Sequence, residues 1–488
     1  MESIEQLDPT EELTSGLVKS RAVKGAAILT ARTFLMQIIS FLANVFLTIF
    51  LEPSQYGVFF LVSAVISFLT YFSDIGFAAA LIQKKEKLTK IELRTVFTTQ
   101  QALVIFLISV VLLTTPIIKN IYHLNDEAIY LLWALAFSLF LSSLKTIPSV
   151  LMERKLEFNK LIIPQLVETT LFNIVVVFLA WKNFGIQSFT IAVLVRGFSG
   201  LLVTYLIQPW IPYLSFSTQA LKSILKFGIP YQLNTLLAMV KDDGMTLFLG
   251  STLGPSGVGL LAWAQKWAFA PLRFFMDQVI KVTFPAFSRL QDNKKELANA
   301  VTKSIFYICL LVFPSLIMLV LLAPSMVEII PKYHKWSGAL LALTLLATNS
   351  ALAAITTPIT NILNAIGKIS VTFKLMIMWT ILTWLFVPPL ALSFGVSGAA
   401  LGFALVGLSS VVALIYASNF VEVDYLKALE KPLIITIILG TVVFVIKSVT
   451  PVSSLQVIAM IIGGIITFSL SLILLEPQIL NHLKIQKR

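Results

Sequence analysis

Long apolar stretches recur along almost the whole chain, and short segments between them hold most of the charged residues. Each stretch has about 20 residues or more, the length a helix needs to cross a hydrocarbon core roughly 30 Å thick. The apolar residues run continuously and do not alternate with polar ones, so the pattern predicts helices and not barrel strands. We identify 14 such stretches, at residues 24–50, 57–82, 93–118, 128–148, 160–181, 187–208, 226–249, 257–285, 300–323, 337–363, 372–393, 396–419, 431–449 and 455–475. The sequence therefore predicts an all-α integral membrane protein.

Composition agrees with this class. Only 12% of the 488 residues are charged and 57% are hydrophobic, whereas soluble domains have about 25% charged residues. The single cysteine, Cys309, excludes a disulfide within the chain, and the three histidines follow no metal-ligand spacing. The N-terminus is acidic and lacks the basic-then-apolar order of a signal peptide, so we expect a solvated tail.

Basic residues alternate between the two sides of the predicted topology. With the N-terminus in the cytoplasm, 26 of the 36 Lys and Arg residues fall in cytoplasmic segments and five in external ones. Cytoplasmic loops of membrane proteins carry this excess of positive charge. We therefore expect both termini in the cytoplasm, and the topology explains the net charge of +12 without a nucleic-acid partner.

Short sequence segments repeat at a nearly constant offset. LEPSQYGV (51–58) and LGPSGVGL (253–260) share Leu, Pro, Ser and Gly at equivalent positions, 202 residues apart. FGIQSFTIA (184–192) and FGVSGAALG (394–402) follow at an offset of 210, as do Pro148 and Pro358. The pattern predicts two six-helix lobes that are copies of one unit, related by an axis along the membrane normal.

These observations predict six segments along the chain. They are a cytoplasmic tail (1–22), an N-terminal lobe (23–209), a cytoplasmic linker (210–225), a C-terminal lobe (226–420), two extra membrane helices (421–475) and a basic cytoplasmic tail (476–488).

Several charged residues lie within the predicted spans. A charge at the bilayer centre costs about 2.5–3.5 kcal/mol on insertion scales, so such residues are expected to face a cavity or a partner. The cations that we predict to line a substrate cavity are Arg32, Arg196, Lys241, Lys266 and Arg273. The acids that we predict to bind a coupling ion or to form gating pairs are Asp74, Glu168, Asp242, Asp243 and Asp277.

A row of Lys and Arg suits an anionic group, because guanidinium binds phosphate through two parallel hydrogen bonds. Lys266, Arg273 and Asp277 are spaced by seven and four residues and share one helical face. Purely structural interpretations remain open for several of these residues. Arg32 and Lys145 lie close enough to helix ends to extend into the headgroups, and Glu168 is also open to a structural role. Lys241 with Asp242 or Asp243 is also a self-neutralising pair, and Arg273 with Asp277 is also an intrahelical pair.

Catalytic motifs are absent from the sequence. It contains no Ser-His-Asp set, no phosphate-binding Gly-rich loop with its Lys and no metal-ligand spacing. We therefore predict a transporter without a cofactor, and not an enzyme. An ATP motor in this chain is excluded, so the energy comes from an ion gradient, the membrane potential or the substrate gradient.

Four segments carry a family resemblance: LEPSQYGVF, SDIGFAAALIQKKE, ERKLEF (153–158) and GPSGVGLLAWAQKW. With them the chain resembles the Wzx-type polysaccharide flippases of the multidrug/oligosaccharidyl-lipid/polysaccharide exporter superfamily, and most of all the colanic-acid and teichuronic-acid exporter subgroup. The resemblance implies two six-helix lobes with two C-terminal helices, in a bacterial cytoplasmic membrane. It implies transfer of undecaprenyl-pyrophosphate-linked oligosaccharide from the cytoplasmic to the external leaflet by alternating access.

The resemblance also implies partners. They are the lipid-linked oligosaccharide, membrane lipids, Na⁺ or H⁺ as coupling ion, and a polysaccharide polymerase and chain-length regulator, with the transporter itself a monomer. Two alternatives remain open. A multidrug or cation antiporter of the same superfamily would have a more acidic cavity. A membrane polymerase or glycosyltransferase would need larger external loops than this chain has.

Overall fold

A computed structural model of the chain describes residues 15–84 and 86–476; within it, the side chains of 15–30, 227–235, 278, 281–282 and 284–285 lie outside the description. The described residues form helices and connecting turns, with no strand among them. The predicted all-α class is therefore confirmed. The chain divides into two compact units, Met1–Gly259 and Leu260–Arg488.

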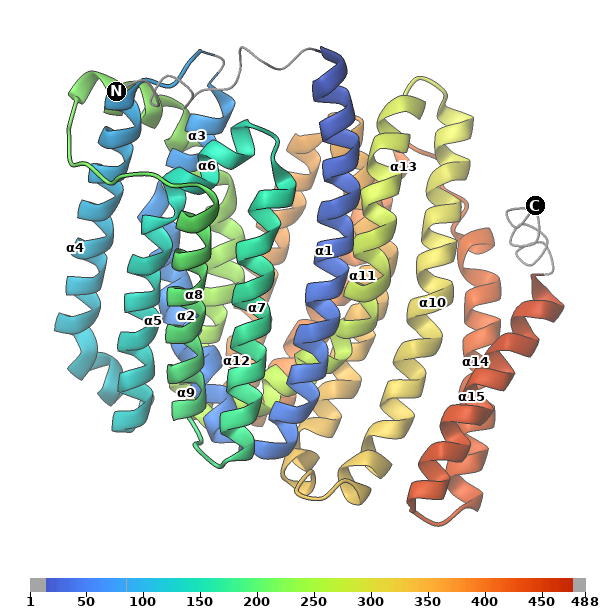
Figure 1. The fold of residues 1–488 in the computed structure, drawn as a ribbon. Coiled ribbons are helices and arrows are strands. Elements are labelled where there is room, and N and C mark those ends of the chain that lie inside the picture. The colour runs from blue at the N-terminus through green and yellow to red at the C-terminus, as the bar shows by residue number, and fades with distance from the viewer. Residues whose placement is uncertain (1–14, 85, 477–488) are drawn as a thin grey trace. The chain divides into compact units, whose positions relative to one another are not determined.

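The first unit contains eight complete helices and the beginning of a ninth (Figure 1). Their bounds are α1 (Ser15–Phe50), α2 (Pro53–Asp74), α3 (Phe77–Gln83), α4 (Lys90–Tyr122), α5 (Asp126–Leu144), α6 (Thr146–Arg154), α7 (Phe158–Trp181), α8 (Gln187–Ile207) and α9 (Thr218–Leu290). Helix α7 lies between α1 and α8, and α8 also packs on α5. Helix α5 in turn contacts α2 and α4, so the long helices form one continuous bundle.

The second unit begins within α9, at Leu260, and continues through six α-helices and one 3-10 helix. Their bounds are α10 (Lys294–Ile329), η3 (His334–Ala339), α11 (Leu340–Ala365), α12 (Ile369–Leu408), α13 (Ser410–Ser418), α14 (Tyr425–Val449) and α15 (Ser454–Leu475). Helix α10 is central, because it contacts α11 on one side and α14 on another. Helix α15 packs on α14 and α10.

Polar residues between the apolar stretches start several helices. Thr89 and Glu92 form a capping box at α4, in which each side chain accepts a backbone N–H of the other residue. Asn125 accepts the Ala128 N–H at the start of α5, and Ser453 accepts the Gln456 N–H at the start of α15. These bonds satisfy N–H groups that have no partner within the helix.

Twelve helical segments among the described residues are long and apolar enough to cross a membrane. Two of them are unusually long, Leu236–Asp277 with 42 residues and Ile369–Ser418 with 50. Each contains one non-helical glycine, Gly254 in α9 and Gly395 in α12, at the position where we predicted a turn between two spans. The predicted count of 14 spans requires each of these two segments to cross the membrane twice, and it stays a prediction.

Two predicted spans are broken in the structure. The span at 57–82 is divided into α2 and α3 at Ile75 and Gly76, whose φ angles of 45° and 75° are left-handed. The span at 128–148 is divided into α5 and α6 at Lys145.

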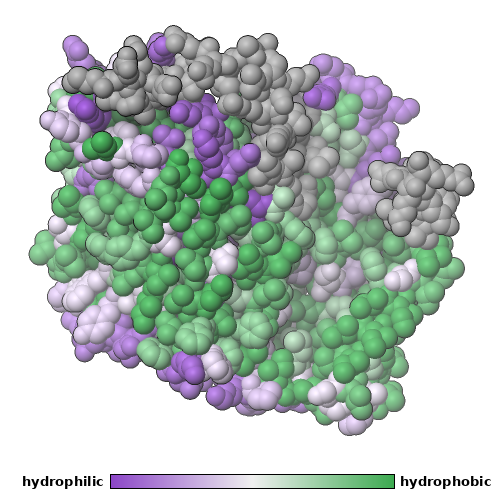
Figure 2. Space-filling model, in the orientation of Figure 1, coloured by the Kyte–Doolittle hydropathy of each residue, from purple (hydrophilic) through white to green (hydrophobic). Residues whose placement is uncertain are grey.

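Apolar side chains also cover the outside of the helices. On the face that Figure 2 shows, hydrophobic residues cover the middle of the first unit over α5, α7 and α8, and hydrophilic residues gather toward the helix ends. Exposed examples are Ile174 on α7 and Leu202 on α8, whose side chains are 59% and 62% exposed. A surface of this kind suits lipid and not water, so the chain is a multi-pass membrane protein.

Candidate functional site

The second unit holds a row of charged residues on α9. At about 100° per residue, Lys266, Arg273 and Asp277 fall within roughly 40° of one another around the helix axis. Lys266 and Arg273 are exposed and Asp277 is half-buried. The charges of Lys266 and Arg273 interact across the two helical turns that separate them. This face of α9 therefore concentrates positive charge within an otherwise apolar segment.

An aromatic cluster fixes this part of α9 in place. The Trp263 ring stacks on Trp336 of η3, with centroids 5.6 Å apart and an interplanar angle of 11°. The Trp263 indole N–H also donates to the Tyr333 hydroxyl at 3.3 Å. Both tryptophans are almost completely buried. Because Trp263 is three residues before Lys266, this cluster fixes the rotation of α9 and the direction of the charged row.

Lys241, Asp242 and Asp243 follow one another on the earlier part of α9, in the first unit. Lys241 Nζ lies 2.7 Å from Asp242 Oδ1, and the aspartate side chain is 68% exposed. This is the self-neutralising pair that the sequence left open. Asp243 is half-buried and lies close enough to Asp242 for their like charges to interact.

Helices α5, α7 and α8 bring together three charged side chains that are far apart in the sequence. Lys145, which caps the end of α5, lies with its Nζ 2.5 Å from Glu168 Oε1 of α7. Arg196 of α8 approaches the other carboxylate oxygen of Glu168, with Nε at 3.8 Å. Gly200 leaves the space for this carboxylate, since a Cβ there would lie 1.8 Å from Glu168 Oε1.

The remaining two site residues lie apart from these clusters. Arg32 is half-buried on α1, and its Nε is buried without a hydrogen-bond partner in the described structure. Asp74 is the last residue of α2, and its carboxylate accepts the Ala78 N–H at 3.3 Å. Asp74 therefore satisfies a backbone group of α3 directly after the break at Ile75 and Gly76.

The two repeated turns, LEPSQYGV and LGPSGVGL, meet in the structure. A Cβ on Gly57 would lie 1.8 Å from the Pro255 carbonyl oxygen, and a Cβ on Gly259 would lie 1.8 Å from the Pro53 carbonyl oxygen. The contact is reciprocal and involves backbone on both sides. Only glycine allows the first two turns of α2 and the segment of α9 after Gly254 to approach so closely.

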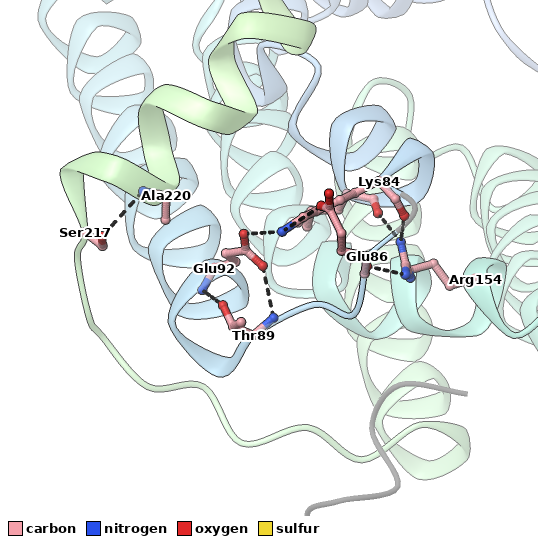
Figure 3. A network of polar contacts seen from close by, with 8 residues as sticks. Lys84, Glu86, Thr89, Glu92, Arg154, Ser217 and Ala220 are labelled. Atoms are coloured by element: carbon pink, nitrogen blue, oxygen red, sulfur yellow. Dashed lines mark hydrogen bonds and ion pairs between the residues drawn. The ribbon is translucent and has the colours of Figure 1, made fainter. Parts of the chain in front are cut away.

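Arg154, from the ERKLEF segment, is a buried cation that we did not predict as important. Its guanidinium donates to the carbonyl oxygens of Leu81, Lys84 and Glu86 at 2.7, 2.6 and 3.1 Å (Figure 3). The three acceptors lie in the last turn of α3 and on the segment that leads from α3 to α4. Arg154 thus joins two of the segments that carry the family resemblance. The presence of both segments in the resemblance is the sequence signal from which the importance of Arg154 could have been inferred.

The predicted linker between the lobes lies against the beginning of α4. The backbone N–H groups of Ser215 and Ser217 donate to the hydroxyls of Thr98 and Thr95. The Arg94 guanidinium also lies over the Tyr213 ring, 4.4 Å from its centroid. Figure 3 shows the start of α9 beside the first turn of α4.

None of the described His, Cys, Asp and Glu side chains form a group of three or more that could hold a metal ion. The structure thus places eight of the ten predicted site residues in a cationic row (Lys266, Arg273, Asp277), an acidic segment with one lysine (Lys241 to Asp243) and an interhelical node (Glu168, Arg196), and it leaves Arg32 and Asp74 apart. Sequence reasoning assigned no site role to Lys145, because a lysine near a helix end usually extends toward the headgroups.

Curated proteins of bacterial polysaccharide synthesis are similar to this chain over most of its length. "Lipopolysaccharide biosynthesis protein WzxC" of Escherichia coli (strain K12) is 24% identical over 383 residues, which is 74% of this chain and 73% of that protein. "Succinoglycan biosynthesis transport protein ExoT" of Rhizobium meliloti (strain 1021) is 23% identical over 449 residues, 89% of each protein. "Teichuronic acid biosynthesis protein TuaB" of Bacillus subtilis (strain 168) is 22% identical and covers 78% of this chain and 80% of that protein.

Solved transporter structures share the fold. "Lipid II flippase MurJ, inward closed conformation" aligns with a TM-score of 0.76 at 14% sequence identity, over 93% of this chain and all of that one. An inward-facing multidrug resistance MATE family transporter of the MOP superfamily aligns with a TM-score of 0.62 at 17% identity, over 78% of this chain and 94% of that one. At these identities the likeness shows the fold alone.

A family model described as "Polysaccharide biosynthesis protein" matches residues 46–340, or 295 of the 488 residues. The match includes both repeated turns, the ERKLEF segment and the charged row on α9. The resemblance expected from the turn and loop motifs is therefore confirmed at the level of the family. With its MurJ-like and MATE-like fold, the chain belongs to the polysaccharide biosynthesis protein family.

Proposed function

We propose that this protein is a flippase for lipid-linked oligosaccharide in the bacterial cytoplasmic membrane, with both termini in the cytoplasm. It transfers an undecaprenyl-pyrophosphate-linked repeat unit from the cytoplasmic to the external leaflet by alternating access, driven by an ion gradient. The family, the named relatives and the transporter fold support a transport role in polysaccharide synthesis. A polymerase and a chain-length regulator would use the product.

The observation that carries the proposal is the cationic row on α9. Lys266 and Arg273 are both exposed within an apolar segment, and their like charges interact. Two exposed cations at this spacing favour a ligand with at least two negative charges, such as a pyrophosphate. A cationic drug would be repelled at the same position, which argues against the multidrug alternative.

The other predicted cations have different surroundings. Arg196 and Arg32, both in the first unit, are further proposed contacts for a substrate anion. Arg196 lies 3.8 Å from Glu168, which Lys145 already pairs, and the Arg32 Nε has no hydrogen-bond partner among the described residues. Lys241 contributes less positive charge, since Asp242 pairs with it.

The predicted acids also differ in their surroundings. Asp74 and Glu168 already have a helix end and a lysine as partners, and Asp242 pairs with Lys241. All five acids remain proposed positions for a coupling cation, Na⁺ or H⁺, or for gating contacts, and Asp243 is half-buried beside the like charge of Asp242.

The test measures export of surface glycan and transfer of lipid-linked oligosaccharide in proteoliposomes for Lys266→Ala and Arg273→Ala. A hydrogen bond to a charged group contributes about 1.5–3 kcal/mol. Each variant should therefore bind substrate about ten-fold or more weakly. Arg273→Lys should keep part of the activity, because it retains the charge but loses the bidentate geometry.

The matched control is Lys303→Ala, which removes an exposed lysine on α10 away from the row. It should export glycan at the wild-type level. Wild-type export of glycan by well-expressed Lys266→Ala and Arg273→Ala variants would contradict the proposal. So would a deletion strain that keeps its surface glycan but becomes sensitive to cationic drugs.

A further inference from the structure

Lys145 and Glu168 form a nearly neutral buried pair in the first unit. Their charged atoms are 2.5 Å apart, and each side chain is only 13% exposed. Burying either charge without the other would cost several kcal/mol, so each requires the other. Because Lys145 satisfies the carboxylate at close range, the longer approach of Arg196 at 3.8 Å adds little to its neutralisation.

Arg196 differs from this pair in being exposed. Its side chain is 55% exposed, although it lies near the middle of α8, nine residues after Gln187. Apart from the approach to Glu168 and a position 5.9 Å from the Phe172 ring centroid, no further ion pair or guanidinium hydrogen bond is found for Arg196 in the described part of the chain. Most of its donors are therefore available.

The exposed side of Arg196 does not face lipid. The exposed apolar residues of α8 form one stripe, which contains Ile191, Phe198, Leu202 and Leu206. At 3.6 residues per turn, Arg196 lies roughly 120° around the helix from the centre of this stripe. Glu168 is displaced by a similar angle from the exposed apolar stripe of α7, which contains Ile163, Ile174 and Phe178. Both side chains therefore lie on the inner side of the bundle.

An aromatic layer separates this node from the ends of α7 and α8 that meet at Gly185, the predicted external end. Phe59 of α2 stacks on Phe189 of α8, with centroids 4.2 Å apart, and lies 6.2 Å from Phe172 of α7. Arg196 follows Phe189 by seven residues, about 10 Å further along α8. Arg196 is thus on the predicted cytoplasmic side of the layer, the side from which a lipid-linked substrate would enter.

We propose that Arg196 binds a phosphate group of the substrate and that Lys145 and Glu168 are its positioning residues. The Glu168 side chain keeps Arg196 on the inner side of the bundle by a contact that an amide oxygen can also make, and Lys145 neutralises Glu168 so that the carboxylate does not capture the guanidinium. The three side chains together have a net charge of +1, which is carried by the exposed arginine. This inference rests on the proposed function, because it supplies a second contact for the anion of the same substrate.

The experiment compares binding of inorganic pyrophosphate and of farnesyl diphosphate by the purified full-length protein in detergent. Arg196→Gln should weaken binding of both probes about ten-fold or more. Lys145→Met should weaken binding to a similar extent, because the unpaired Glu168 then holds Arg196. The double variant Lys145→Met/Glu168→Gln should return to within a few-fold of wild type, since the carboxylate no longer competes.

This rescue separates positioning from a purely structural role. If the pair only supports packing, the double variant binds at least as weakly as Lys145→Met, and the proposal is wrong. If Lys145→Met does not fold, Glu168→Gln decides: it should bind pyrophosphate as tightly as wild type or more tightly, and weaker binding overturns the proposal. Binding of farnesyl diphosphate alone would assign the contact to the lipid and not to the phosphate, and would also overturn it.

The two proposals fail in different ways. Loss of export in Lys266→Ala and Arg273→Ala, together with unchanged pyrophosphate binding in Arg196→Gln, leaves the flippase assignment intact and removes only the role of Arg196. Wild-type export by the α9 variants removes the flippase site itself, whatever Arg196 binds.

Discussion

Replacing Gly57 by alanine should open the contact between the two repeated turns. The new Cβ would lie 1.8 Å from the Pro255 carbonyl oxygen and 2.6 Å from the Gly259 nitrogen. Ordinary C···O contacts begin near about 3.3 Å. The turns must therefore separate by roughly 1.5 Å, and no side-chain rotation relieves the clash because both partners are backbone atoms.

Two opposing free-energy contributions determine how strongly Gly57→Ala destabilises the contact. Alanine is favoured over glycine within a helix by about 1 kcal/mol, and Gly57 lies in the second turn of α2. Overpacking a tight contact costs about 1–3 kcal/mol, and more where backbone must move. A net loss of about 1–2 kcal/mol would reduce the population of the closed contact by about five- to thirty-fold.

The assay measures how fast an external, membrane-impermeant maleimide labels a cysteine at Val258, which is 4% exposed beside the contact. Cys309 is the only natural cysteine, so Cys309→Ala provides a clean background. With Gly57→Ala, labelling should become about ten-fold faster and the thermal midpoint should fall. Gly259→Ala should change the labelling rate and the thermal midpoint in the same way. The double variant should change them little further, because both substitutions separate the same two segments.

The control is Gly440→Ala in α14, where a Cβ would meet the Ile317 side chain at 3.1 Å and not backbone. That side chain can shift, so the variant should keep its thermal midpoint and its labelling rate. Slow labelling and a raised midpoint in Gly57→Ala would mean that helix propensity alone decides, and the reasoning from the close contact would be refuted.

Three further substitutions test contacts outside the proposed anion path. Arg154→Ala removes three hydrogen bonds to buried carbonyl groups and should lower the unfolding free energy by about 3 kcal/mol or more, measured by denaturation in detergent; an unchanged midpoint would contradict this. Trp336→Ala removes the stacking partner of Trp263 and should cost about 3–5 kcal/mol, with a matching loss of intrinsic fluorescence change on unfolding. Asp74→Asn should still export glycan, because an amide oxygen can accept the Ala78 N–H as the carboxylate does; loss of export with a normal thermal midpoint would instead assign Asp74 to ion coupling.

The helical segments could be predicted from the sequence because each depends on its own residues. A run of apolar side chains specifies a membrane helix wherever it lies, and a Thr or Asn before the run specifies its start. The breaks at Gly76 and Lys145 were not predicted. Lys145 has a helical conformation, φ −86° and ψ −10°, so the local sequence gives no strong turn signal there.

The charged row on α9 was also predictable, whereas the node around Glu168 was not. Lys266 and Arg273 belong to one helix, so the helical repeat alone places them on one face. Lys145, Glu168 and Arg196 come from three elements, and their meeting depends on how α5, α7 and α8 rotate against one another. A single sequence contains no periodicity that reports such rotations.

The repeated turns were predictable only in part, because the local sequence indicates each turn but not that the two turns meet. Pro-Ser-Gly segments are common turn chemistry, and the sequence alone supported only a tight reversal in each copy. The reciprocal contact of Gly57 with Pro255 and of Gly259 with Pro53 is a second reason why both turns need a glycine at this position. The two-fold axis that we predict from the repeat would bring equivalent positions of the two copies together near the axis, where a side chain on either copy would meet its counterpart. Glycine is the residue that such a position requires, so the predicted repeat would give the matching glycines and the close contact one physical cause.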